Sequence, residues 1–123
     1  VGKTEANLVG IVEGIVSSAG CSLAYPVIMT KDGHTLHSHY HGNVLKEGDL
    51  VLGDFGSETA MHYAGDLTRT YPAGKAFTER QKEIYNIVLK MQTYSLNALK
   101  PGVNYKDVHL LAAKKMTDGL NGI

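Results

Sequence analysis

The chain has 123 residues, of which 43% are hydrophobic and 20% are charged, a composition typical of one globular domain or part of one. Its 12 basic residues balance its 12 acidic ones, so the sequence indicates neither a nucleic-acid-binding nor an anionic-membrane-binding surface. A single cysteine, Cys21, excludes an internal disulfide and is expected to be a buried, unreactive thiol. With no evident signal peptide or membrane-spanning apolar run, the sequence predicts a cytoplasmic protein.

The first predicted element is a helix that begins after Thr4 as N-cap and ends at Gly20. Residues 22–40 are then expected to form a strand, a tight turn at Asp32-Gly33 with positive φ, and a second strand. The apolar residues of the helix recur at helical spacing and are predicted to face the core: Leu8, Ile11, Val12, Ile15, Val16 and Ala19.

Two more strands are expected before the pattern changes. Residues 50–58 begin with a short apolar run that is typical of a strand covered on both faces. Residues 58–72 form the next strand, which ends at Pro72. Strands grouped apart from helices predict an α+β fold with an antiparallel sheet.

Two helices close the predicted order of elements. Thr78 and Gln81 fit a capping box at the start of the first, which stops at Pro101-Gly102. The second begins near Asn104 and ends at Asp118-Gly119. The residues that it is expected to bury are Val108, Leu111, Ala112 and Met116.

Asp54 and Asp66 lie in apolar surroundings, where an unpaired carboxylate is costly. If residues 50–58 and 62–70 pair as a hairpin that turns around Ala60, the two aspartates lie directly opposite each other, with Cβ atoms about 4.5–5.5 Å apart. A divalent metal ion would remove the repulsion between them, and oxygen ligands favour manganese or magnesium over copper. Two exposed aspartates near a turn are the alternative, and the residues alone leave both interpretations open.

Four histidines lie close together: His34, His37, His39 and His41. On a strand, the last three would share one face and could chelate a transition metal. A polar, exposed hairpin would carry the same pattern, so this alternative stays open. His62, beside a turn, and His109, on a helix, are expected to be structural.

The run from Leu50 to Leu89 resembles the metal-binding segment of the prolidase and aminopeptidase P family, which are metallopeptidases with the pita-bread fold. Residues 51–56 match its hydrophobic-hydrophobic-x-Asp-x-Gly pattern, and residues 63–72 match Tyr-Ala-x-Asp-Ile-Thr-Arg-Thr-Phe-Pro almost position by position. Phe77, Gln81 and Tyr85 match further markers. One departure is that residues 55–65 between the aspartates number one more than in many relatives. The extra residue is expected in the turn near residues 59–61.

The resemblance implies a role for each site residue. Asp54 would chelate one metal ion and Asp66 would bridge two, while the hydroxyl of Thr68 would hold a ligand carboxylate in place. His37, in a Leu-His pair, would donate to the peptide substrate or the developing oxyanion without binding metal. The implied cofactors are two divalent ions, manganese first, with cobalt or zinc as alternatives. The implied reaction is attack of a metal-bridging hydroxide on the carbonyl before a proline at the second position of a peptide.

The family's remaining ligands, a histidine and two glutamates, lie further along than Ile123. The resemblance therefore predicts that residues 1–123 form the N-terminal half of a pita-bread catalytic domain, an antiparallel sheet with helices packed on one face. Alone it is expected to be inactive and to associate into a homo-oligomer through exposed sheet surface. The alternatives are a non-catalytic pita-bread binding module and a methionine aminopeptidase-like enzyme. The aspartate pair argues against the first, and the run at residues 68–72 against the second.

Overall fold

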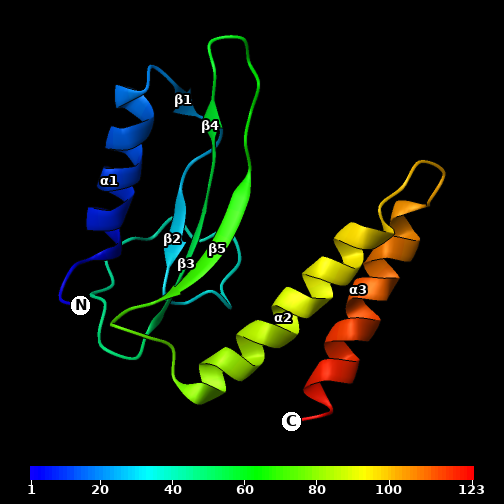
Figure 1. Ribbon diagram of the computed structural model, residues 1–123. Helices are drawn as coiled ribbons and strands as arrows, with labels where there is room; N and C mark the ends of the chain where they lie inside the picture. Colours follow the sequence, from blue (N-terminus) through cyan, green and yellow to red (C-terminus); the bar gives the residue numbers. More distant parts are fainter. The chain divides into compact units, whose positions relative to one another are not determined.

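The computed structural model describes residues 1–123. The elements in chain order are α1 (Glu5–Ser18), β1 (Ser22–Leu23), β2 (Ile28–Thr30), β3 (Leu50–Phe55), β4 (Ser57–Glu58), β5 (Leu67–Pro72), α2 (Glu79–Ala98) and α3 (Tyr105–Leu120) (Figure 1). This order confirms the predicted α+β class. The chain forms two compact units, Val1–Phe77 with every strand and Thr78–Ile123 with α2 and α3. That both units belong to one catalytic domain stays a prediction.

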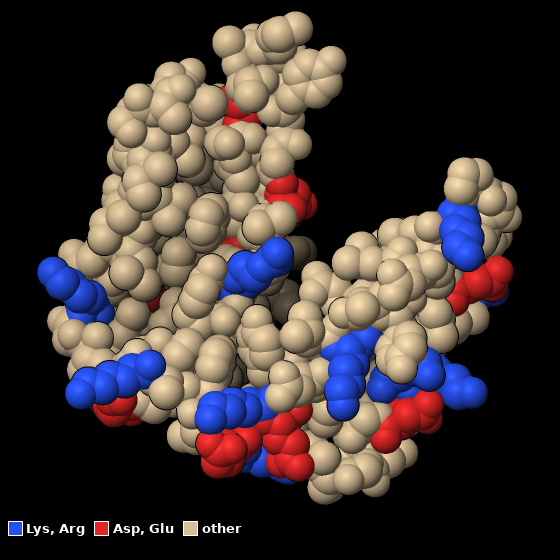
Figure 2. Space-filling model, viewed as in Figure 1, with Lys and Arg blue, Asp and Glu red and all other residues tan.

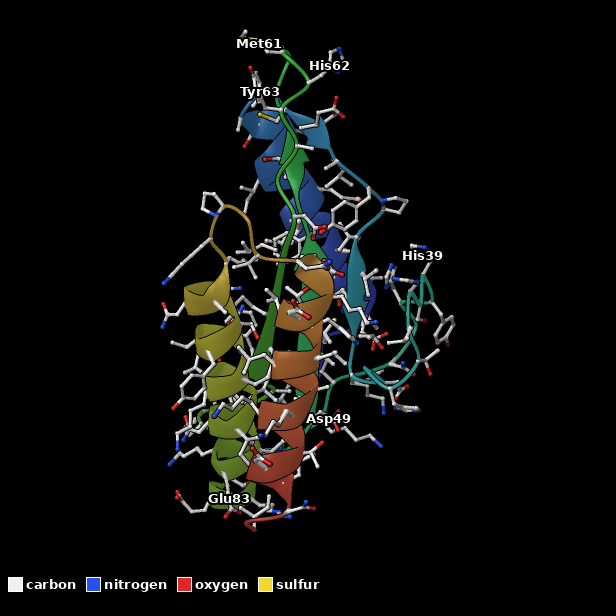
Figure 3. All side chains as sticks on the ribbon, turned by 90° about the vertical axis from the view of Figure 1, so that its right-hand side faces the viewer. His39, Asp49, Met61, His62, Tyr63 and Glu83 are labelled. Carbon is white, nitrogen blue, oxygen red and sulfur yellow. The ribbon has the colours of Figure 1, made fainter.

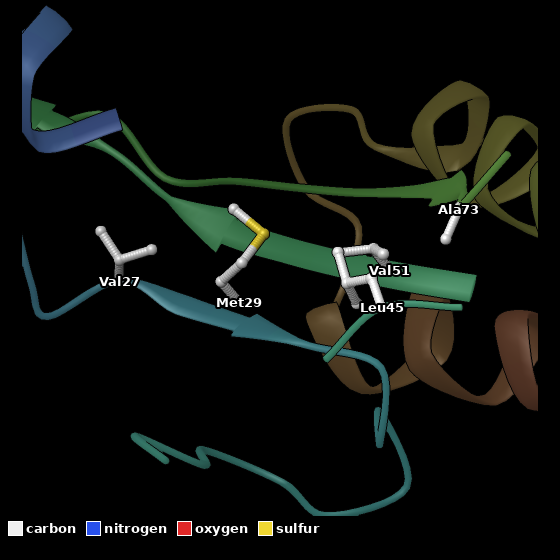
Figure 4. Packing of buried hydrophobic residues seen from close by; sticks show 5 residues of the cluster. All are labelled: Val27, Met29, Leu45, Val51 and Ala73. Atoms are coloured by element: carbon white, nitrogen blue, oxygen red, sulfur yellow. The ribbon is translucent and has the colours of Figure 1, made fainter. Parts of the chain in front are cut away.

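The first unit is built on a three-stranded antiparallel sheet in the order β2-β3-β5, beside a short antiparallel pair of β1 and β4. Side chains alternate between the two faces of the sheet. On one face Met29 lies opposite Gly53, where an added Cβ would come within 3.3 Å of the Met29 methyl carbon. This face carries the core, formed by Val27, Met29, Leu45, Val51 and Ala73 (Figure 4), and α1 packs on it through Leu8, Val9 and Val12. By the same alternation, Asp54 lies on the opposite face.

The ends of α1 are as predicted, but its buried stripe is narrower. The capping box is formed by Thr4 and Asn7, and Gly20 follows the C-cap with φ of 73°. Ile11 and Ile15, predicted to face the core, are 59% and 64% exposed. Since β1 and β2, which α1 contacts, are two and three residues long, they cover only part of the helix. Cys21 is half-buried rather than buried.

Residues 31–43 contain no strand, so the second strand predicted for residues 22–40 is wrong. We call residues 31–43 the histidine loop. Gly33 does not have positive φ; a turn is closed instead by the Thr35 N–H, which donates to the Asp32 carbonyl at 2.8 Å. The sheet ends at β2 on this side, so no strand pairs with the loop. His37 has φ of 53° within it.

The second unit is a pair of helices that lie side by side (Figure 1). The capping box of Thr78 with Gln81 and the N-cap at Asn104 are confirmed, as is burial of Val108. The other residues that the last helix was expected to bury are only half-buried: Leu111, Ala112 and Met116. The predicted end of the last helix is wrong, because α3 continues through Gly119 to Leu120. A Cβ on Gly119 would lie 2.5 Å from the Cγ2 of Ile87. This glycine therefore allows α3 to approach α2 closely and does not end the helix.

The surface charges are mixed. On the face drawn in Figure 2, lysine and arginine side chains are interspersed with aspartate and glutamate. Two pairs on α2 illustrate this: Arg80 with Glu83 at 2.8 Å and Lys82 with Glu79 at 2.7 Å. None of the helices combines the length and the apolar character that a membrane span requires.

Candidate metal-binding site

Asp54 is placed by the middle strand of the sheet. In β3 it lies opposite Ile28 of β2 on one side and Thr68 of β5 on the other, and it is half-buried. Asp66 is exposed and directly precedes β5. The predicted register, with Asp54 directly opposite Asp66, is therefore wrong.

In the observed register the two aspartates still lie on the same face of the sheet. The true partner of Asp54 is two residues along from Asp66, and side chains two residues apart in a strand share a face. Asp66 is thus diagonal to Asp54, a relationship for which sheets show separations of about 7–8 Å between the residues. The two carboxylates are further apart than predicted but still face the same space.

The register is set by the hairpin turn at its tip. The His62 N–H donates to the Thr59 carbonyl at 2.8 Å, and the Thr59 N–H donates to the Tyr63 carbonyl at 3.0 Å. His62 has φ of 63°. These features describe a three-residue hairpin loop whose last residue is left-handed. Figure 3 shows Met61, His62 and Tyr63 together at the tip of the hairpin.

Gly56 allows the second aspartate to approach the end of β3. A Cβ added at Gly56 would lie 1.7 Å from the carbonyl oxygen of Gly65 and 3.0 Å from the backbone nitrogen of Asp66. No real Cβ tolerates the shorter distance, so only a glycine at position 56 allows the backbone of residues 65–66 to pass this close to the end of β3. The family-like pattern Asp-x-Gly thus has a steric reason at its third position.

Tyr25 joins the two aspartates, and the sequence analysis did not identify it. Its hydroxyl lies 2.7 Å from Oδ1 of Asp54 and 2.7 Å from Oδ1 of Asp66. The Ala24 N–H, which donates to the Gly56 carbonyl at 2.9 Å, anchors the neighbouring backbone. Burial, followed by the two carboxylates, raises the pKa of Tyr25 far above its usual value, so the hydroxyl stays protonated. The only signal in the sequence was a polar aromatic residue before Pro26 and a buried strand.

This arrangement fits a divalent cation. A tyrosine hydroxyl has one proton and can donate to only one carboxylate at a time. At the other 2.7 Å contact two oxygens meet without a proton between them, and two negative charges face one point. A divalent ion bound by the carboxylates would compensate both charges, and all-oxygen ligands suit manganese or magnesium.

Within residues 1–123 the set of ligands is incomplete. No group of three or more His, Cys, Asp and Glu side chains is arranged to hold a metal ion. A cleft of about 450 Å³ does occur, but α2, α3 and the residues after α3 form it, and it includes none of the predicted site residues. Within residues 1–123, Asp54 and Asp66 thus converge as two carboxylates without a third candidate ligand beside them.

The predicted histidines do not form a cluster. The shared strand face predicted for residues 37, 39 and 41 is wrong, since the histidine loop is not a strand. His37 is exposed and makes no hydrogen bond with Asp54 or Asp66. His41 is turned inward, with Nδ1 3.2 Å from the carbonyl oxygen of Met29. His62 at the hairpin tip pairs with Glu58, in keeping with a structural role.

Thr68 is placed directly across from Asp54 by the pairing of β3 with β5. Its carbonyl accepts a hydrogen bond from the Arg69 guanidinium at 2.7 Å. The register thus brings the Thr68 side chain to the same face as both aspartates.

Comparison with known proteins assigns the family. The family model "Metallopeptidase family M24" matches residues 1–123. Over 85 residues, 69% of this chain, the sequence is 44% identical to the Xaa-Pro aminopeptidase of Haemophilus influenzae; over 103 residues, 82% of this chain, it is 34% identical to Xaa-Pro aminopeptidase 1 of Streptomyces coelicolor. The chain spans 20% and 21% of the length of these two relatives.

Solved structures agree with the sequence comparison. The fold matches zinc-substituted Escherichia coli aminopeptidase P in complex with product, with a TM-score of 0.90, 35% identity, and coverage of 97% of this chain and 28% of that one. A glutamate-to-alanine variant of the same enzyme in complex with substrate matches with a TM-score of 0.91. The predicted pita-bread architecture is confirmed. The chain belongs to metallopeptidase family M24.

Proposed function

We propose that the protein containing these residues is a metal-dependent peptidase that hydrolyses the bond before a proline, as an Xaa-Pro aminopeptidase or dipeptidase. The observation that carries the proposal is the convergence of Asp54 and Asp66 on the Tyr25 hydroxyl, 2.7 Å from each. Membership of family M24 and the names of the matched relatives support the class of reaction.

In this proposal Asp54 and Asp66 are ligands of two divalent ions, with manganese preferred and cobalt or zinc as alternatives. When bound, such ions act as Lewis acids on the scissile carbonyl group. The chain's own residues orient the ligands. The Tyr25 hydroxyl donates a hydrogen bond to one of the two carboxylates. Thr68, which lies opposite Asp54, holds the Asp54 carboxylate through its own hydroxyl.

His37 is proposed to contact the peptide. Its exposed imidazole is free to donate a hydrogen bond to the substrate or to the oxyanion that develops at the reacting carbonyl. The substrate class is a peptide with proline at the second position. Because proline lacks an N–H, a site for the bond before it needs no acceptor at that nitrogen.

Residues 1–123 alone are proposed to be inactive, since they offer no third ligand. A homo-oligomer is supported by large apolar side chains that remain exposed on unit 1, among them Ile11, Ile15 and Tyr71. A cytoplasmic location is compatible with the free thiol of Cys21.

The test is hydrolysis of paired peptides, Xaa-Pro-Xaa and Xaa-Ala-Xaa, by the full-length protein with manganese. We expect only the proline peptide to be cleaved. Asp54→Asn or Asp66→Asn should reduce the rate of this cleavage at least about a hundredfold, because each substitution removes a charged metal ligand. Asp118→Asn, at an exposed carboxylate in α3, is the matched control and should leave the rate unchanged. Cleavage that survives both aspartate substitutions would refute the proposed metal site.

Calorimetric titration of residues 1–123 with manganese tests the incompleteness of the ligand set. Weak binding that disappears in the Asp54→Asn, Asp66→Asn double variant is expected. Tight binding of two ions per chain would contradict it, because further ligands would then come from within this chain or from a second copy.

A further inference from the structure

Glu5 is a buried carboxylate outside the aspartate site. It is the first residue of α1 and is 0% exposed. Its Oε1 accepts hydrogen bonds from the Lys31 N–H at 2.7 Å and from the Asn43 side-chain amide at 3.2 Å. Its Oε2 accepts from the Asn43 N–H at 3.4 Å. All the polar partners of this side chain thus come from two positions.

Those two positions are the ends of the histidine loop. A second set of hydrogen bonds runs in the opposite direction, from the helix to the loop. The N–H groups of Glu5 and Ala6, which have no acceptor within α1, donate to the carbonyls of Asn43 at 3.0 Å and His41 at 2.9 Å. The side-chain amide of Asn43 also donates to Oδ2 of Asp32 at 3.1 Å, which joins the two ends of the histidine loop directly.

The charge at Glu5 makes this connection strong. A buried carboxylate without donors would be very unfavourable, so its burial requires both ends of the loop to be in place. Hydrogen bonds to a charged acceptor are about twice as strong as neutral ones, and a carboxylate in the first turn of a helix is favoured by the helix dipole. The loop in turn has no neighbouring strand to pair its backbone. Glu5 and the loop ends therefore depend on each other.

His37 lies in the middle of this loop with φ of 53°. A left-handed conformation is costly for any residue with a Cβ, and it persists only where the surrounding structure imposes it. We propose that Glu5 is a positioning residue for the histidine loop, holding its two ends to the start of α1 and thereby fixing the place and conformation of His37. The functional part of this inference rests on the proposed contact of His37 with the peptide substrate.

Amide hydrogen exchange, followed residue by residue by NMR in the full chain, tests the structural part. Glu5→Gln keeps the shape but turns an NH₂ group toward the donors of Asn43. We expect the Lys31 and Asn43 amides to exchange about tenfold faster or more, the His37 amide resonance to shift, and the amides of β3 to stay unchanged. Glu13→Gln, at an exposed position of the same helix, is the matched control and should change none of these.

Asn43→Ala removes the donor from the other side and should give the same local pattern, so it decides the question if Glu5→Gln does not fold. Equal acceleration throughout unit 1, or no acceleration in the loop, would overturn the proposal. In the full-length protein, Glu5→Gln should raise KM for an Xaa-Pro peptide more than it lowers kcat, with unchanged metal content. If the unsubstituted protein cleaves no such peptide, the proposed function fails, while the exchange measurement still decides the role of Glu5.

Discussion

The hydroxyl of Tyr25 lies 2.7 Å from a carboxylate oxygen of Asp54 and 2.7 Å from one of Asp66. Both distances are normal for O–H···O hydrogen bonds, yet only one proton is present to serve them. The Tyr25 hydroxyl therefore lies at the point where two carboxylates from different parts of a hairpin converge. Its contribution to the free energy of unfolding can be measured.

Tyr25→Phe should lower the free energy of unfolding by about 1–2 kcal/mol, because one hydrogen bond to a charged acceptor is lost and the site is partly open to solvent. Urea denaturation followed by circular dichroism measures this. Tyr105→Phe, which removes an exposed hydroxyl at the start of α3, should leave the unfolding free energy of its unit unchanged. A Tyr25→Phe variant as stable as the parent would show that the hydroxyl does not bind the carboxylates.

Gly56→Ala should displace Asp66 and destabilise unit 1 by about 1–3 kcal/mol, since the new methyl group would overlap the Gly65 carbonyl oxygen. The same substitution should weaken any manganese binding that depends on both aspartates. Gly10→Ala in α1, where nothing lies within 4 Å of the new Cβ, is expected instead to stabilise by about 0.5–1 kcal/mol. Equal effects of the two substitutions would contradict the close crossing at Gly56.

His62→Gly should raise the free energy of unfolding by about 0.5–1 kcal/mol, because glycine adopts the left-handed position of the turn without the strain of a Cβ. The substitution also removes the pair with Glu58, but the His62 side chain is 86% exposed and such pairs contribute little. Glu58→Gln measures that pair separately and should change stability by less than the turn substitution. Thermal melting of both variants is sufficient, and a loss of stability in His62→Gly would refute the strain argument.

Thr78→Ala should destabilise α2 by about 1 kcal/mol. Its hydroxyl accepts from the Gln81 N–H at 3.2 Å while the Gln81 side chain accepts from the Thr78 N–H at 2.9 Å, and the substitution breaks this box. Thr93→Ala, inside the same helix, removes only a bond to a carbonyl that the helix already uses and should not destabilise. Helix content against temperature distinguishes the two variants.

The helices were largely predictable because the residues that determine where each helix begins lie next to that position in the sequence. Thr4, Thr78 and Asn104 each accept a hydrogen bond from the first turn that follows, and Gly20 directly follows the C-cap of α1. The predicted stop of α2 at Pro101-Gly102 is late, because α2 ends at Ala98. How much of the predicted apolar stripe of α1 is buried was not predictable, because it depends on how little surface the short strands β1 and β2 offer. Similarly, Gly119 carries the signature of a helix end but serves close packing against Ile87.

That Asp54 and Asp66 come together was predictable from the sequence, but the register that brings them together was not. Neither Asn-Gly nor Asp-Gly marks the turn at residues 60–62, and a histidine in a left-handed position leaves no such signature. Both aspartates still lie on one face of the sheet, as predicted, because a register shift of two residues preserves the alternation of side chains. Tyr25 and Glu5 escaped notice because their partners lie far away in the sequence. The histidine loop was mistaken for a strand because its alternating pattern does not reveal whether a neighbouring strand exists.

The placement of the two aspartates on one hairpin has a consequence for the order of folding. Only residues 56–66, which form the outer part and the turn of the same hairpin, separate β3 from β5, so the entropy lost on pairing these two strands is small. The histidine loop is secured only when residues 2–6 find residues 41–45 across the length of α1, β1 and β2. We expect the carboxylates to assemble in the early, local phase of refolding and His37 to reach its place in the slower, non-local one.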